Sequence, residues 1–419
     1  MGVVGIIAEY NPFHFGHKHH LELSKKITNS EYSIVAMSGS FVQRGEPSLV
    51  DKWTKAKMAI DNGVDLVIEL PFIFSVQSAE LFAYGSVSLL NSLKIVDFIS
   101  FGSEIGELKY LYPIADVLCK EPLHYKQLLK KYLQMGNSFP VARNRALNEY
   151  FSTSIRDKNR DLNIDKIINS PNNILAIEYL KALKKLNSHI KPITIKRVGS
   201  QYNDVELKSK IASATAIRKK LLECNDISSI KDYIPEKTYN NLANYIDDYQ
   251  HFNSLDNYNQ IIHYLLRIQN REKLSKIMDV EVGLENRMVE KSYNFNKFDD
   301  FINSIVTKRY PRSRIQRILV HLMMDLYKDT FKDLCLHHPA YIRVLGSNEK
   351  GFSLINRIKE KTDIPIIIKY SDYHNLKNPY IEKIISFDKK ATDLFFLGLK
   401  TEKTLTNMDY YTTPYIQKK

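Results

Sequence analysis

The stretch that decides the fold is Asn11-Pro12-Phe13-His14-Phe15-Gly16-His17. It follows an apolar run at residues 3–7 that has the character of a buried strand, and it precedes a helical pattern at residues 17–27. A helix N-terminus presents free N–H groups and a partial positive charge, which both suit phosphate. Gly16 has no side chain that would keep a nucleotide away from the backbone. The stretch therefore predicts a phosphate-binding turn between the first strand and the first helix.

Two histidines frame Gly16 in this turn. Imidazole N–H groups at these positions can donate hydrogen bonds to phosphate oxygens as charge builds up during displacement at phosphorus. Two surface histidines beside an ordinary turn are the alternative, since the chain has 12 histidines. Their place directly after the first strand favours chemistry, and we predict His14 and His17 as catalytic residues.

The first hundred residues repeat a pattern with the length of a βα unit. The expected buried strands are residues 3–7, 33–37, 65–70 and 96–100. The expected helices between them are residues 17–27, 52–62 and 78–93. This alternation predicts an α/β fold with a Rossmann-like, doubly wound parallel sheet. Ligands bind beyond the carboxyl ends of such strands, which here are the loops at residues 8–17, 38–45, 71–74 and 101–104.

The rest of the chain is expected to be mostly helical. Residues 105 to about 185 have helical patterns, and residues 192–198 are expected to return to the sheet as one more strand. A polar stretch at residues 225–229 suggests a boundary, so we divide the chain into domains 1–225 and 226–419. The second domain is expected to be mostly helical and basic, with a strand at residues 364–369.

The chain carries a formal net charge of +13. A polyanion such as RNA or DNA is therefore an expected partner, and a merely basic enzyme is the alternative. The three cysteines (Cys119, Cys224 and Cys335) are far apart and have no metal-ligand spacing, so we expect no metal site and a reducing, cytoplasmic setting. No apolar run approaches the ~18 residues of a membrane span, and the first residues lack the pattern of a signal peptide.

A second motif, Ser213-x-Thr215-x-x-Arg218, opens a helix that is expected to end near Glu223. Ser and Thr are favoured at helix starts, so an N-cap role alone would explain both hydroxyl groups. Arg218 lies about one turn further on and adds a cation that suits phosphate. The motif therefore predicts a second phosphate contact.

Together these two motifs resemble those of the nucleotidyltransferase superfamily marked by a His-x-Gly-His turn and a Ser-Ser-Thr-x-x-Arg-like motif, with Ala214 in place of the second Ser. Longer stretches resemble the bacterial tRNA(Met) cytidine acetate ligases over essentially the whole chain. They are AEYNPFH (residues 8–14), MSGSFVQRGEP (37–47), ELP (69–71), FGSE (101–104), SPNNIL (170–175) and KRYPRSRIQR (308–317).

The resemblance implies an ATP-dependent ligase that joins acetate to AMP as acetyl-adenylate. The acetyl group then passes to N4 of the wobble cytidine of elongator tRNA(Met), giving N4-acetylcytidine, AMP and pyrophosphate. ATP is the implied co-substrate, together with Mg2+, and acetyl-CoA is not used. The first domain is then the nucleotidyltransferase-like catalytic domain, and the second is the tRNA-binding domain.

The resemblance also implies site residues. The implied ATP contacts are Ile7, Ala8, Glu9, Tyr10, Asn11, Pro12, Phe13, His14, Phe15, Gly16, His17, Lys18, His19, His20, Gly102, Asn172, Arg197, Ser213, Thr215 and Arg218. Asn172 follows Pro171, so a helix N-cap is an alternative role for it. The expected tRNA contacts are Lys308, Arg309, Arg312, Arg314 and Arg317, five cations in a stretch without an acid, for which a solvated helix face is the alternative.

Two other functions fit parts of this pattern. An adenylyl- or cytidylyltransferase that acts on a small metabolite would explain the two nucleotide motifs but not the basic second half. A non-catalytic RNA-binding module would explain the charge but would leave the histidine turn without a task.

Overall fold

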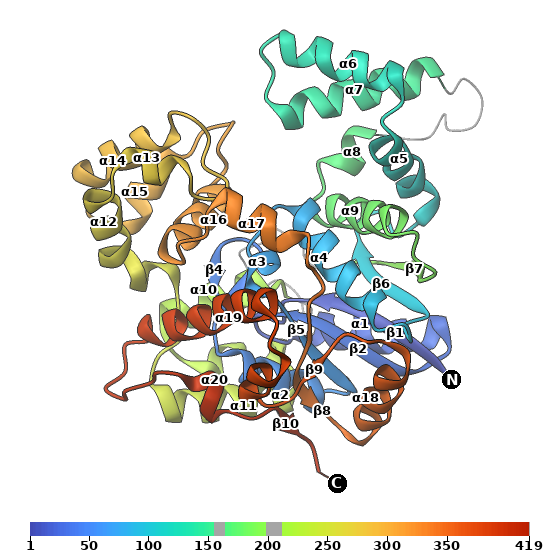
Figure 1. Ribbon diagram of the computed structural model, residues 1–419, viewed down its shortest axis with the longest axis vertical. Coiled ribbons are helices and arrows are strands. Elements are labelled where there is room, and N and C mark those ends of the chain that lie inside the picture. Colours follow the sequence, from blue (N-terminus) through green and yellow to red (C-terminus); the bar gives the residue numbers. More distant parts are fainter. Residues whose placement is uncertain (155–163, 198–211, 419) are drawn as a thin grey trace.

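The computed structural model describes residues 1–154, 164–197 and 212–418, and its centre is an eight-stranded sheet (Figure 1). The strand order is β10-β8-β5-β2-β1-β6-β7, with β9 beside β8. The strands from the first half of the chain are β1 (Gly2–Ala8), β2 (Ser30–Ser38), β5 (Leu66–Leu70), β6 (Phe98–Ser103) and β7 (Lys191–Lys196). Val198, the last residue of the strand expected at residues 192–198, lies outside the described residues.

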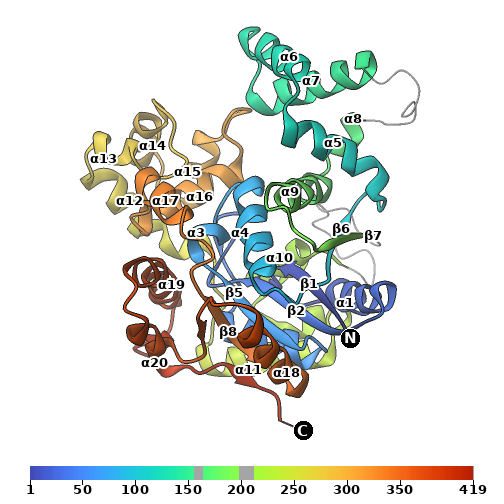
Figure 2. The same cartoon turned by 45° about the vertical axis from the view of Figure 1, so that its right-hand side comes forward.

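These five strands run parallel to one another, which confirms the predicted fold class. Their apolar character has a direct cause, because helices pack against the sheet and bury it. Every residue of β5 is buried, for example, and Val3, Val4 and Ile6 of β1 are at most 1% exposed. The covering helices include α1 (Phe15–Thr28), α2 (Lys52–Asp61), α4 (Ala79–Ser92) and α9 (Pro171–Lys185), and α4 and α9 lie side by side (Figure 2).

The second half of the chain also contributes strands to the sheet. Its sequence indicated one strand in this half but not that the strand joins the sheet of the first half. Strand β8 (Ile342–Ser347) pairs antiparallel with β5, and β9 (Ile366–Ile367) and β10 (Tyr415–Ile416) pair parallel with β8. The strand expected at residues 364–369 is therefore present but shorter. The sheet thus crosses the expected domain boundary at residue 225.

A buried ion network holds these late strands in place. Lys52 of α2 lies 2.9 Å from Glu69 of β5 and 2.8 Å from Asp409 of α20 (Met408–Tyr411). Arg343 of β8 contacts both carboxylates, at 3.3 Å from Glu69, and none of the four side chains is more than 3% exposed. Two cations and two anions thus connect the first and last parts of the chain.

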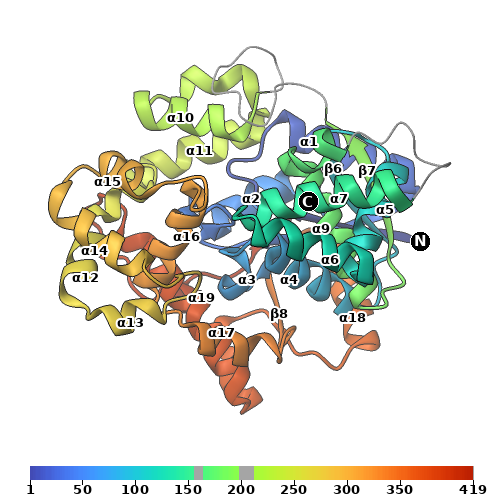
Figure 3. The same ribbon diagram turned by 90° about the horizontal axis from the view of Figure 1, so that it is seen from above.

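Two groups of helices project from the sheet (Figure 1). One comprises α5 (Leu108–Lys120), α6 (Leu123–Gln134), α7 (Phe139–Ser154) and α8 (Ile164–Ile168), as expected for residues 105–185. The other comprises α12 (Asn259–Ile268), α13 (Arg271–Ser275), α14 (Leu284–Asn294), α15 (Phe298–Ile305) and α16 (Arg312–Met323). Helices α10 (Ala214–Cys224) and α11 (Glu236–Tyr249) lie next to each other, and α11 packs against α2 (Figure 3). The hairpin of β3 (Phe41–Val42) and β4 (Glu46–Pro47) contacts α16 through β4. None of the helices in the described ranges has the length and apolar character needed to cross a membrane.

Candidate active site

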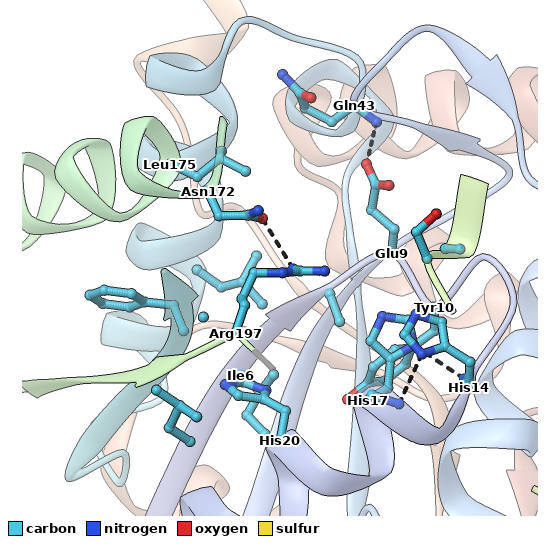
Figure 4. Close-up of a pocket in the computed structure, with 18 of the residues that line it drawn as sticks. Ile6, Glu9, Tyr10, His14, His17, His20, Gln43, Asn172, Leu175 and Arg197 are labelled. Carbon is cyan, nitrogen blue, oxygen red and sulfur yellow. Dashed lines mark hydrogen bonds between the residues drawn. The ribbon is translucent and has the colours of Figure 1, made fainter. Parts of the chain in front are cut away.

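The turn between β1 and α1 is shaped by its two histidines. His14 is the N-cap of α1, and its Nδ1 accepts a hydrogen bond from the Gly16 N–H at 3.0 Å. The Nδ1 of His17 accepts one from the His14 N–H at 3.3 Å, and the two rings stack with their centroids 3.8 Å apart (Figure 4). The imidazoles therefore occupy backbone donors that we expected phosphate to meet.

These contacts determine where each imidazole carries its proton. Because both Nδ1 atoms accept hydrogen bonds, the proton of each neutral ring is on Nε2. Burial and, to a smaller extent, the positive charges of Arg197 and Arg218 together lower the pKa of His14 to about 3. Burial also lowers the pKa of His17 well below its ordinary value, with His14 adding to the effect. Near neutral pH both rings are thus uncharged, and each has an Nε2–H free of these backbone contacts.

The histidine turn opens into a cavity of about 230 Å³ at the carboxyl ends of β1, β6 and β7. The predicted ATP contacts that line it are Ile7, Ala8, Glu9, Tyr10, His14, Gly16, His17, His19, His20, Gly102, Asn172, Arg197, Ser213, Thr215 and Arg218. The structure thus brings together residues from both motifs. The other predicted contacts are Asn11, Pro12, Phe13, Phe15 and Lys18, which are described but are not part of this lining. Asn11 is buried and accepts a hydrogen bond from the Leu49 N–H at 2.7 Å, and Phe13 is fully buried.

Arg197 and Asn172 form one side of the cavity. The Arg197 guanidinium donates to Asn172 Oδ1 at 3.2 Å (Figure 4). Asn172 Nδ2 in turn donates to Glu104 at 2.7 Å. The N-cap of α9 is Ser170, so the alternative that Asn172 serves as a cap is wrong. A Cβ atom at Gly102 would lie 3.3 Å from Arg197 Cγ, and so this glycine leaves space for the arginine.

The second motif lies against the first. Ser213 is the N-cap of α10 and accepts from the Ala216 N–H at 3.1 Å, as its position in the sequence predicts. Arg218 donates to the carbonyl oxygen of Asn11 at 2.9 Å and lies 3.5 Å from Glu46. Its guanidinium is therefore oriented at the histidine turn.

Residues that we did not name also line the cavity. Gln43 and Arg44 come from the turn of the β3–β4 hairpin, within the segment 38–45 that was predicted to face the ligand, and the Gln43 N–H donates to Glu9 at 2.8 Å. The apolar side chains are Ile6, Phe82, Phe101, Leu175, Tyr179 and Ile195. They provide a surface suited to the flat face of a purine. The predicted crevice at the strand ends was the signal that could have indicated Ile6, Phe101 and Ile195. Phe82 of α4 and Leu175 of α9 come from helices, and only the fold brings them to the cavity.

The expected tRNA contacts lie at the start of α16, and most of them are paired. Arg309 and Arg314 contact Glu281, and Arg312 contacts Asp299. Arg317 is only 9% exposed and lies 3.2 Å from Asp279. The sequence shows no acid within this stretch, but folding brings carboxylates from other segments to it.

Comparison with known proteins places this site in a class. The chain matches the model of the HIGH nucleotidyl transferase family over residues 1–409, and it belongs to that family. Within the class, it belongs with the tRNA(Met) cytidine acetate ligases. It is 46% identical to the protein of that name from Thermoanaerobacter sp. (strain X514) over 411 residues, which cover 98% of each chain. It is 42% identical to the one from Clostridium perfringens (strain ATCC 13124) over 99% of this chain and 100% of the relative.

Solved structures agree with this assignment. The crystal structure of Thermotoga maritima TmcAL bound with alpha-thio ATP is similar with a TM-score of 0.92, at 32% identity and 99% coverage of both chains. The apo form of that protein gives a TM-score of 0.93 at the same identity and coverage. The similarity therefore extends over the sheet and both projecting groups of helices.

Proposed function

We propose that this chain is an ATP-dependent ligase that activates acetate and acetylates N4 of the wobble cytidine of elongator tRNA(Met). One observation carries the proposal: relatives named tRNA(Met) cytidine acetate ligase match nearly the whole chain at 42–46% identity. The cavity supports it independently, because neutral histidine donors, Arg197 and Arg218 converge where the nucleotide phosphates would lie.

The first step needs positioning more than proton transfer. Acetate is ionised at neutral pH, so its oxygen can attack the α-phosphorus of ATP without a general base. The new O–P bond forms as the bond to the β-phosphate oxygen breaks, which releases pyrophosphate and leaves acetyl-adenylate. His14 and His17 would donate through Nε2–H to the oxygens on which charge develops, while Arg197 and Arg218 attract the same charge. The apolar wall of Phe82, Phe101 and Leu175 would hold the adenine.

The second step transfers the acetyl group. The N4 amine of cytosine attacks the acetyl carbonyl carbon, the bond to the phosphate oxygen of AMP breaks, and N4 loses one proton. The leaving phosphate of AMP is the proton acceptor that the reaction itself supplies. We further propose that the enzyme is cytoplasmic and that it uses free acetate and not acetyl-CoA.

Mg2+ would bind together with ATP, and the protein would not hold it in a separate metal centre. Among the described residues, no group of three or more His, Cys, Asp and Glu side chains is arranged to hold an ion. Mg2+ commonly binds through substrate phosphates, waters and one or two carboxylates, and Glu9 is a carboxylate that lines the cavity. When bound, the ion would neutralise charge on the pyrophosphate.

Exchange of labelled pyrophosphate into ATP tests the proposal without tRNA. We expect exchange that requires acetate, because labelled pyrophosphate enters ATP only when it attacks the phosphorus of acetyl-adenylate and displaces acetate, the reverse of adenylate formation. Exchange that ignored acetate but responded to a phosphorylated metabolite would favour a small-metabolite transferase. Absence of any exchange, with intact RNA binding, would favour a non-catalytic module.

A further inference from the structure

A second, larger groove adjoins the nucleotide cavity and has no assigned role. Its volume is about 1080 Å³, and its walls come from α10, residues 251–259, the start of α15 and the start of α16. Figure 3 shows α10 on one side, with α15 and α16 on the other. Thr215 and Arg218 line both this groove and the nucleotide cavity. The two spaces therefore meet at the motif that opens α10.

We propose that this groove binds the single-stranded RNA loop that carries the target base, and that the base passes Thr215 and Arg218 to reach the nucleotide. This inference rests on the proposed function for the identity of the RNA. A base that undergoes chemistry must leave its stack and enter a pocket, which requires an opening beside the reactive phosphate. In this arrangement the opening lies at Thr215 and Arg218, the two residues that line both spaces.

The groove carries no excess positive charge, and Asp256 and Asp300 are exposed carboxylates outside the ion pairs of the described residues, but two cations are available to RNA phosphates. The carboxylates Glu46, Glu223, Asp256, Asp299 and Asp300 line it, and so do five cations. Three cations face carboxylates: Arg218 with Glu46, Lys219 with Glu223 and Arg312 with Asp299. The other two, Lys297 and Lys400, are exposed and have no ion pair within the described ranges. They flank the groove from the start of α15 and the end of α19 (Pro379–Leu397), where RNA phosphates would pair with them.

The neutral side chains of the groove suit unpaired bases. Sequence-specific RNA recognition acts mostly on single-stranded loops, through hydrogen bonds to base edges and stacking on aromatic rings. Amide side chains supply both donors and acceptors, and the ring of His251 is exposed on the same wall. The accessible amides of the lining are the exposed Asn225 and Asn296 and the half-buried Asn257 and Asn259, whereas Asn253 and Gln316 are buried and hydrogen-bonded within the protein. A phosphate-only surface would not need them.

Two variants test the groove without touching the nucleotide cavity. Lys297→Gln with Lys400→Gln removes the two unpaired charges, and Leu222→Trp narrows the groove at a side chain that is 44% exposed on α10. The control for the double lysine variant is Lys120→Gln with Lys130→Gln, which removes two exposed charges at the end of α5 and on α6. The control for Leu222→Trp is Leu123→Trp at the start of α6. Each protein is titrated, without ATP or acetate, against a fluorescent transcript of the elongator tRNA(Met) anticodon stem-loop.

We expect the groove variants to bind the transcript at least ~10-fold more weakly than their controls. The double lysine variant should also lose about 1.4 from the slope of log affinity against log salt, at about 0.7 per single-strand phosphate contact. Affinities and slopes equal to those of the controls would overturn the inference. Acetate-dependent pyrophosphate exchange, measured on the same proteins, should stay at the unmodified level. Absence of exchange in the unmodified chain would refute the proposed function, whereas the RNA affinities alone decide the groove.

Discussion

At the scale of single residues, the histidine turn works by holding its imidazoles neutral. Each Nδ1 accepts a hydrogen bond from a backbone N–H of the turn, so each ring carries its proton on Nε2 and can donate it to another group. A protonated ring would lose its backbone contact and add a charge beside Arg197 and Arg218. The turn is thus the start of α1 and, in the proposed function, also the donor set for phosphate.

Removal of either imidazole should slow adenylate formation. We expect His14→Ala or His17→Ala to reduce acetate-dependent pyrophosphate exchange by ~10²–10³, the loss typical when one transition-state donor is removed. Exposed His189→Ala is the matched control and should leave the rate unchanged. Near-normal exchange in both cavity variants would contradict the catalytic assignment.

The depressed histidine pKa values also predict how stability depends on pH. Burial lowers the pKa of His14 to about 3, against about 6.5 in an unfolded chain. Between these values the unfolded state binds a proton that the folded state does not, so stability rises with pH through this window and is lost as pH falls below about 6.5. His14 should lower the free energy of unfolding by about 1.4 kcal/mol for each pH unit below 6.5. Between pH 6.5 and pH 5, the free energy of unfolding of His14→Gln should therefore fall by about 2 kcal/mol less than that of the unmodified chain. Urea unfolding at the two pH values measures this, and equal losses in both proteins would contradict it.

At the scale of elements, the sequence was informative where strands are continuous apolar runs. Strands β1, β2, β5 and β6 were predictable for that reason, and so was the crevice beyond their carboxyl ends. Strand β8 was not, because Arg343 and Gly346 interrupt its pattern and its pairing partner β5 lies far away in the chain. Likewise, the pairing of Arg317 with Asp279 depends on contacts between distant segments, and local charge patterns do not show it.

The buried network that holds β8 should be costly to break. Arg343→Met leaves Glu69 and Asp409 with Lys52 as the remaining cation of the network, so we expect a loss of about 3–5 kcal/mol in the free energy of unfolding. Lys126→Met is the matched control, because its 3.4 Å pair with Glu121 is exposed and should contribute at most about 1 kcal/mol. Urea unfolding measures both. A loss for Arg343→Met no larger than for the control would show that the network does not anchor β8.

At the scale of the whole molecule, the nucleotide cavity and the groove that we propose for RNA are adjoining parts of one body. The sheet takes strands from both ends of the chain, while α16 carries the basic stretch toward the groove that meets the nucleotide cavity. Arg314 and Arg317 are largely covered, with side chains 22% and 10% exposed, so the predicted RNA contacts that stay accessible are Lys308, Arg309 and Arg312. The two accessible arginines would exchange their contacts with Glu281 and Asp299 for RNA phosphates. Arg317 instead stabilises the fold.

These three side chains should contribute to RNA affinity and not to adenylate formation. Changing Lys308, Arg309 and Arg312 to Gln should reduce the salt slope of tRNA binding by about 2, at about 0.7 for each contact. The control changes the exposed Lys359, Lys361 and Lys377 to Gln, which removes the same charge elsewhere. Equal slopes in the two triple variants would make the start of α16 an ordinary solvated face, and loss of pyrophosphate exchange would indicate damage to the fold.

The central claim is that acetate, activated by ATP, becomes the acetyl group on the wobble cytidine. The direct measurement is mass analysis of nucleosides from elongator tRNA(Met) after incubation with the protein, ATP and isotopically labelled acetate. We predict labelled N4-acetylcytidine, with one acetyl group added at the wobble position, and none when ATP is omitted or labelled acetyl-CoA replaces acetate and ATP. Labelled nucleoside from acetyl-CoA alone, or no N4-acetylcytidine under any condition, would contradict it.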